Sequence, residues 1–330
     1  MDSDSNRLVR ELRDAGLSEQ VVKAAWPSWW SDDLASSPSG RAELRFALAR
    51  KLGLSPRGLI GERVEFVWND QARFKHLSTE SVTQRAALAS FGVTIGRLLV
   101  RATPSDGSLE GLDAHQIREA VLASRQYVDL PGLLAVCWGA GIPVIYLRVF
   151  PLTAKSMHAM VVEAGERYAI LLARDARYPA PVAFTLAHEL GHALLGHLAD
   201  ASALVDLEDP AMSRGTDEQE SEADRFALTL LTGRADPEIT TSVPRFNAPT
   251  LANAVLNAGR EHRIEPGTLA LCLAYRRGAW PVAMASLKFI YGRALPVWRE
   301  VNAYAGSQLD WGGIGDESAD YIRNVMDADG

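Results

Sequence analysis

Residues 184–197 read Phe184-Thr-Leu-Ala-His-Glu-Leu-Gly-His-Ala-Leu-Leu-Gly-His197. His188 and His192 stand four residues apart, a little over one helical turn, so on a helix both imidazoles project from one face. Apolar residues in the same stretch recur at helical spacing and would form its buried side: Leu186, Leu190, Ala193 and Leu194. This stretch therefore predicts a helix with two imidazoles on one face.

Two imidazoles at this spacing can occupy two of the four tetrahedral positions around zinc, and His188-Glu189-x-x-His192 is the zinc-peptidase signature. Glu189 can reach a water at the metal without being a ligand, which makes it the candidate general base and then general acid. The chain has only 7 histidines, so we expect this pattern by chance in roughly one such sequence in a hundred. The sequence predicts one Zn²⁺ ion per chain.

The third protein ligand must come from outside this motif. The extended pattern with a third histidine requires glycine at position 195 and histidine at 198, but the chain has Leu195 and Leu198. The subclass of zinc peptidases whose third ligand is a histidine of this extended motif is therefore excluded. His197 is one residue short of the required position, and we interpret it as a partner of the helix C-terminus rather than as a ligand.

A second helix is predicted downstream, where an acidic run becomes amphipathic: Asp217-Glu-Gln-Glu-Ser-Glu-Ala-Asp-Arg-Phe-Ala-Leu228. Glu220 and Asp224 lie four residues apart on the face that also carries the apolar residues Ala223, Ala227 and Leu231. Glu220 is therefore the predicted third ligand, and Asp224 the predicted hydrogen-bond acceptor of a ligand histidine. The neighbouring Glu218 and Glu222 are less favoured, since Glu222 lies on the opposite side of the helix.

Peptide-bond hydrolysis also needs a donor for the oxyanion of the tetrahedral intermediate. Tyr178, His158 and Arg225 are candidates for this donor. The sequence does not place any of them near the two helices.

Composition describes an ordinary soluble protein of two or three domains: 330 residues, 47% hydrophobic, with a formal charge of −7. Two cysteines, Cys137 and Cys272, cannot build a disulfide framework, so we expect a cytoplasmic protein. No secretory signal is visible at the start. The uncharged stretch from 130 to 147 contains prolines and glycines that favour a buried helix, a turn and a strand, so no membrane partner is expected.

The charge is unevenly distributed. Residues 1–39 carry −3, residues 40–101 carry +6 and residues 102–330 carry −10. A basic segment in an acidic chain suits a partner such as a phosphate backbone, and the competing interpretation is a solvated face that binds nothing.

A helix-turn-helix pattern lies within this basic segment. Ala49, Gly53 and Leu59 fit its spacing, with one helix ending at Gly53 and the next beginning at Ser55-Pro56. The candidate contacts to DNA or to another partner are Arg45, Arg50 and Arg57. The alternative is a helical scaffold or protein-docking domain.

The predicted fold class is α+β and mostly helical, with a three-stranded sheet from residues 142–147, 159–163 and 168–173. A long helix from Thr79 to Arg101 is expected to close the basic domain, ahead of a linker at 103–108. Four segments result: an N-terminal helical segment (1–39), the basic helical domain (40–105), a metallopeptidase domain (110–280) and a helical C-terminal appendage (281–330). The appendage is apolar enough to pack on the domain before it.

Residues 184–192, together with Glu220-x-Glu-Ala-Asp-x-Phe-Ala227, resemble the ImmA/IrrE family of zinc metallopeptidases, over roughly residues 112–280. The basic segment resembles the Xre-type helix-turn-helix domain often fused ahead of that family. The resemblance implies a zincin-like domain and a cytoplasmic endopeptidase that cuts a transcriptional repressor in a stress-response or mobile-element circuit. One departure is Leu230-Leu-Thr-Gly233, where members commonly have Leu-Leu-Met-Pro.

Three functions compete at this point. The first is a zinc endopeptidase, the second a DNA-binding regulator with a structural or sensory zinc site, and the third a toxin-antitoxin-type partner protein. Glu189 favours the first, because a structural zinc site has no use for an uncoordinated carboxylate beside an open metal position.

Overall fold

The computed structural model describes residues 3–61, 63–68, 72–75, 81–104, 107–153, 157–199, 201–207, 217–239 and 245–326. The α-helices in these ranges are α1 (Ser3–Asp14), α2 (Glu19–Ala25), α3 (Asp32–Ala35), α4 (Pro38–Leu52), α5 (Pro56–Ile60), α6 (Val82–Arg101), α7 (Ala114–Leu122), α8 (Leu130–Gly139), α9 (Pro179–Leu194), α10 (Glu218–Thr232), α11 (Ala248–His262), α12 (Pro266–Arg277), α13 (Trp280–Tyr291), α14 (Val297–Gln308) and α15 (Asp316–Met326). The strands are β1 (Ala72–Lys75), β2 (Val144–Tyr146), β3 (Ala159–Ala164), β4 (Arg167–Leu172) and β5 (Ala203–Asp206).

The fold is α+β, as predicted, but the sheet has five strands rather than three, in the order β1-β5-β3-β4-β2. The three predicted strands are β2, β3 and β4. The prediction of three was wrong because β1 and β5 each have only four residues, too few for a clear alternating pattern. β5 pairs antiparallel with β3 and parallel with β1, so it lies inside the sheet.

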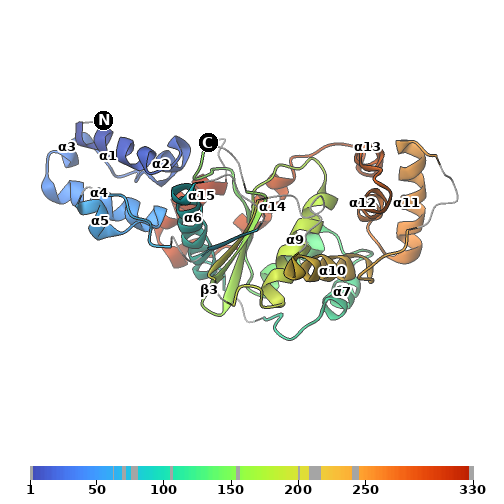
Figure 1. The fold of residues 1–330 in the computed structure, drawn as a ribbon. Helices are drawn as coiled ribbons and strands as arrows, with labels where there is room; N and C mark the ends of the chain where they lie inside the picture. Colours follow the sequence, from blue (N-terminus) through green and yellow to red (C-terminus); the bar gives the residue numbers. More distant parts are fainter. Residues whose placement is uncertain are drawn as a thin grey trace.

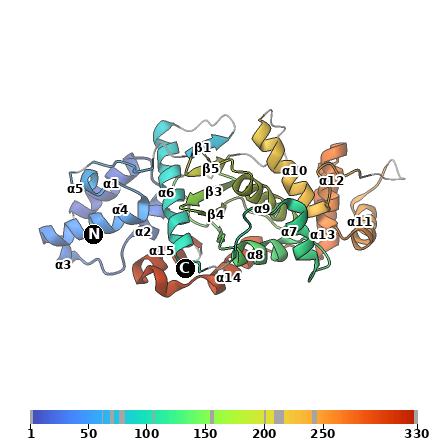
Figure 2. The ribbon, with the colours of Figure 1, turned by 90° about the horizontal axis from the view of Figure 1, so that it is seen from below.

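Helices cover both faces of this sheet. α6 packs against β3, β4 and β5 on one face, and α9 packs against β3 and β4 on the other (Figure 2). Two glycines of α6 allow the close approach, because an added Cβ would lie 2.1 Å from Met160 Sδ at Gly92 and 2.7 Å from Val162 Cγ1 at Gly96. Met160 and Val162 therefore face α6, and the alternate residues of β3 face α9.

Packing divides the chain differently from the four predicted segments. One buried apolar cluster is continuous from the N-terminal helices through the sheet to α14 and α15, and a second joins α11, α12 and α13. Figure 1 shows helices α1–α5 at one end, the sheet in the middle and α11–α13 at the other end. α6, expected to close the basic domain, packs on α4 and also supplies one layer over the sheet. Its predicted start at Thr79 lies outside the described residues.

The C-terminal helices α14 and α15 pack between the N-terminal helices and the sheet and so connect them. Asn302 of α14 accepts a hydrogen bond from the Tyr146 N–H and donates one to the Tyr146 carbonyl, which satisfies the backbone of the edge strand β2. α15 packs on α2, and its Glu317 accepts hydrogen bonds from Trp29 and Arg50. Residues 281–326 thus contain helices, as predicted, and two of these contact the main core.

The predicted pair of helices around Gly53 is present. Gly53 ends α4 with a left-handed φ of 67°, and the Ser55 side chain caps α5. The second helix has only five residues, however, and Arg45 is buried with its guanidinium donating to the Leu59 carbonyl. The structure corrects the expectation for Arg45, which stabilises the helix pair instead of facing a partner.

The uncharged stretch from 130 to 147 forms α8, a turn and β2, as the sequence predicts. Within the described ranges, no helix combines the length and the apolar character needed to cross a bilayer.

Candidate metal centre

The HExxH motif lies on α9, which begins with a proline in its first turn and runs through residue 194. His188, Glu189 and His192 are each 0% exposed. The helical spacing brings the two imidazoles together, with Nε2 of His188 and Nε2 of His192 3.0 Å apart. The predicted helix is present and places the two imidazoles on one face, while the roles of the three residues stay predictions.

α10 supplies the first acidic group. It packs along α9 at Gly191, where an added Cβ would lie 3.2 Å from Ala223 Cα, so a side chain there would separate the helices. Glu220 is 5% exposed, with one carboxylate oxygen 3.4 Å from His188 Nε2 and the other 3.5 Å from His192 Nε2. Of the neighbours weighed against it, Glu218 is exposed and Glu222 points to a different histidine.

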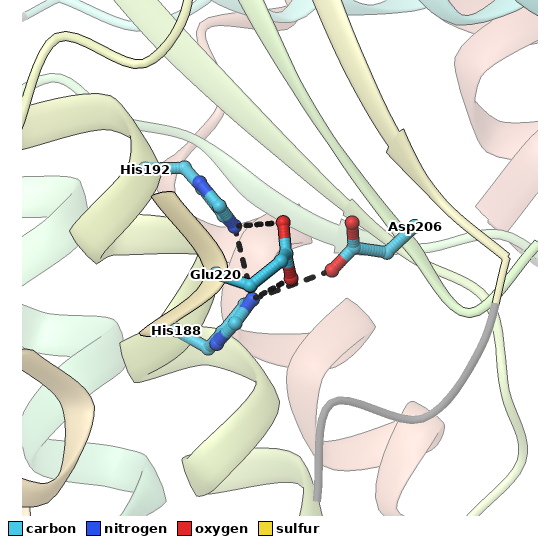
Figure 3. A group of neighbouring side chains, drawn as sticks. All are labelled: His188, His192, Asp206 and Glu220. Carbon is cyan, nitrogen blue, oxygen red and sulfur yellow. Dashed lines mark hydrogen bonds and ion pairs between the residues drawn. The ribbon is translucent and has the colours of Figure 1, made fainter. Parts of the chain in front are cut away.

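A fourth group, Asp206, is one that the sequence did not identify. It is the last residue of β5, is 1% exposed, and has Oδ2 3.5 Å from His188 Nε2. Figure 3 shows its carboxylate pointing to the same place as the two imidazoles and Glu220. These four residues each offer one ligand atom, and the four atoms all lie within 4.8 Å of one another. Asp206 does not stand at a metal-ligand spacing from either motif. It reaches the site because β5 pairs with β1 and β3.

The outer nitrogens of the two imidazoles have partners of their own. His188 Nδ1 lies 2.9 Å from Asp224 Oδ1, so the predicted contact of Asp224 is present. His192 Nδ1 lies 2.8 Å from His197 Nδ1, and His197 Nε2 lies 3.1 Å from Glu222 Oε2. Such contacts fix the rings and leave Nε2 of each ligand histidine facing the cluster.

Three buried carboxyl groups, those of Glu189, Asp206 and Glu220, surround the two imidazoles. Burial lowers the pKa of His188, but the neighbouring carboxylates of Asp206, Asp224 and Glu220 outweigh burial and hold the pKa well above its ordinary value. Burial and the neighbouring His188 lower the pKa of His192 to about 3, so this ring is neutral and its Nε2 can act as a ligand. Burial and the adjacent Asp206 raise the pKa of Glu189 well above its ordinary value.

The donor set fits a divalent metal ion. Neither oxygen of Glu189 or of Asp206 has a hydrogen-bond donor among the described residues, although both side chains are buried. Buried carboxylates without donors are costly unless a cation or a proton compensates them. Two imidazole nitrogens with two carboxylates are the ligand types that zinc binds in proteins.

None of the three candidates for the oxyanion donor belongs to the metal cluster. Tyr178 precedes the first residue of α9, ten residues before His188, which is about 15 Å along a helix. Its ring stacks on Tyr291 instead. His158 Nε2 contacts Thr185 Oγ1 at 2.9 Å, and Arg225 is exposed on α10.

Two cavities flank the start of α9. The larger, about 680 Å³, is lined by Phe184 and Trp280 and by Asp224 and Arg225 of α10. The smaller, about 400 Å³, is lined by His158, Tyr178 and the same Trp280. Asp224 lines the larger cavity and also contacts His188 Nδ1, so this cavity lies beside the His188 ring.

Residues 139–238 match the family model described as Peptidase_M78, IrrE N-terminal-like domain. The matched segment is just under a third of the chain and contains α9, β5 and α10. No curated protein matches the chain. The match supports the resemblance to the ImmA/IrrE family for the segment with the metal cluster, and the basic N-terminal region lies outside it.

Proposed function

We propose that this chain is a zinc-dependent endopeptidase. The observation that carries the proposal is Glu189, a fully buried carboxylate on the same helix turn as two ligand histidines and without a hydrogen-bond donor among the described residues. A carboxylate in that position serves no structural purpose, whereas peptide hydrolysis needs a base there.

The roles follow from the contacts. His188, His192 and Glu220 hold the ion, and Asp224 orients His188 from outside. Zinc in such a site supplies Lewis acidity and makes water nucleophilic near neutral pH. Glu189, fully buried and adjacent to His188, is placed to accept a proton from the water and then to donate it to the leaving amine.

The substrate we propose is a transcriptional repressor or similar regulatory protein of the cytoplasm. Support for this part comes from the resemblance to ImmA/IrrE peptidases and from the larger cavity beside His188, whose mixed apolar and charged lining suits a peptide segment. The basic region adds no support for DNA binding, because Arg45 is buried and Arg50 pairs with Glu317. Of the three predicted contacts, Arg57 is exposed and forms no side-chain hydrogen bond or ion pair with the described residues.

The test uses the zinc-loaded full chain and its Glu189→Gln variant, incubated with a lysate of the source cells. New protein N-termini are then labelled and identified by mass spectrometry. We expect the unmodified protein to generate a small set of new termini, and the variant to bind one zinc ion and generate none.

Two controls accompany this comparison. A chelator added to the unmodified protein should suppress the same termini, and Glu166→Gln, in the turn between β3 and β4, should leave them unchanged. A Glu189→Gln variant as active as the unmodified protein would contradict the proposal.

A further inference from the structure

We propose that Asp206 is a fourth protein ligand of the metal, and that the site is closed until the Asp206 side chain turns away. The inference rests on the proposed function, because it concerns how that site is regulated. Structural zinc sites have four protein ligands, whereas catalytic sites have three and one open position. The cluster therefore has the composition of a closed site around a catalytic motif.

Asp206 lies about as far from His188 as Glu220 does. Ligand atoms about 2.0–2.1 Å from a tetrahedral zinc ion lie about 3.3–3.4 Å from one another. From His188 Nε2, the nearest oxygen of Glu220 lies at 3.4 Å and that of Asp206 at 3.5 Å. Glu220 also lies 3.5 Å from His192 Nε2, and the ligand atoms of all four residues, Asp206 included, lie within 4.8 Å of one another.

The sheet holds Asp206 in this orientation. Asp206 pairs with Ala159 of β3, and cross-strand partners share a face of the sheet. Met160, the next residue of β3, faces α6, so Ala159 and Asp206 face α9 and its histidines. The Asp206 carbonyl accepts a hydrogen bond of 2.7 Å from the His158 N–H, which fixes the backbone.

Closure agrees with the burial of the whole cluster. His188, His192 and Glu189 are 0% exposed, and Asp206 is 1% exposed. These groups are therefore closed off from solvent in this arrangement. Because the backbone of β5 is paired on both sides, the smallest change that vacates a ligand position is a rotation of the Asp206 side chain.

A different role for Asp206 would also explain its burial. Its carboxyl lies next to that of Glu189, and one proton shared between them would remove the need for a metal contact. An asparagine at position 206 separates the two roles. The amide can still donate a hydrogen bond to Glu189, but it replaces a carboxylate ligand poorly.

The experiment compares the full chain with Asp206→Asn and Asp206→Ala in two measurements. The first is Zn²⁺ affinity by competition with a chromogenic chelator. The second is binding of acetohydroxamate to the Co²⁺-loaded protein, followed by the visible spectrum of the ion. We expect both variants to bind Zn²⁺ at least about tenfold more weakly. We also expect them to bind acetohydroxamate at least about tenfold more tightly, because a ligand position is open.

Glu163→Gln, on the neighbouring strand β3, is the matched control and should change neither measurement. Circular dichroism of each variant confirms folding. If Asp206→Asn retains the Zn²⁺ affinity and acetohydroxamate affinity of the unmodified protein, the inference is overturned, while the proposed peptidase stands with an open site. If the unmodified protein binds no Zn²⁺, the proposed function fails together with the inference.

Discussion

His192 and His197 face each other through their Nδ1 atoms, 2.8 Å apart. Only one of the two nitrogens can carry the hydrogen. His192 Nε2 faces the metal cluster, so His192 Nδ1 is the donor and His197 Nδ1 the acceptor. His197 Nε2 then donates to Glu222, at 3.1 Å. This chain of contacts fixes the tautomer of a metal ligand from outside the cluster.

Replacement of His197 tests this relay. In His197→Ala the His192 ring loses its acceptor, so we expect Zn²⁺ affinity to fall about 10–100-fold, as measured by chelator competition. His115→Ala, at an exposed position of α7, is the matched control and should have no effect. Equal affinity in all three proteins would show that His197 does not orient His192.

Removal of the metal should destabilise the fold. Without a cation, the carboxylates of Asp206, Glu189 and Glu220 face one another in a buried space, so the chelated protein should melt several degrees lower by calorimetry. Free Zn²⁺ at a hundred times its dissociation constant contributes about 2.7 kcal/mol to the free energy of unfolding. The melting temperature of His188→Ala should change little when the chelator is added. A large decrease in that variant would contradict stabilisation by a metal at this site.

The contact between α6 and the sheet can be tested by adding one methyl group. Gly96→Ala would bring Cβ to 2.7 Å from Val162 Cγ1, a stiff β-branched side chain, and we expect a loss of about 1–3 kcal/mol in the free energy of unfolding. Gly306→Ala on α14 meets nothing within 4 Å and should instead gain up to about 1 kcal/mol. Urea unfolding measures both, and changes of the same sign would contradict the packing.

The two thiols should be inert in the native protein. Burial raises the pKa of Cys137 and of Cys272 to about 12, so at pH 8 only about one thiol in ten thousand is ionised. A colorimetric disulfide reagent should therefore detect no thiol in the folded chain and two in guanidinium chloride. Rapid reaction of one native thiol would show that its surroundings open readily.

Local patterns predicted the two helices of the site. The spacing of His188 and His192 and that of Glu220 and Asp224 is one helical turn, and helical geometry depends only on residues close in the sequence. Helical spacing therefore placed Glu220 and Asp224 on one face of their helix, whereas the packing of α10 on α9 decided that Asp224 contacts His188.

Local sequence patterns could not predict which strands pair or which charged side chains form ion pairs. β5 is recognisable only through its partners β1 and β3, since four residues carry too little periodicity. The basic segment looked like a surface for phosphate, yet Arg45 is buried against α5 and Arg50 pairs with Glu317, which lies 267 residues later.

By itself the sequence determined an α+β protein with two amphipathic helices, one carrying His188 and His192 on one face with Glu189 beside them, the other carrying Glu220 and Asp224 on one face. Only the tertiary structure decided that Asp206 joins this cluster, that His197 supports His192, and that α6 covers the sheet. The physical reason is the distance along the chain between the residues that interact. Helical periodicity is fixed by neighbours within four residues, whereas the register of a short buried strand depends on partners far along the chain.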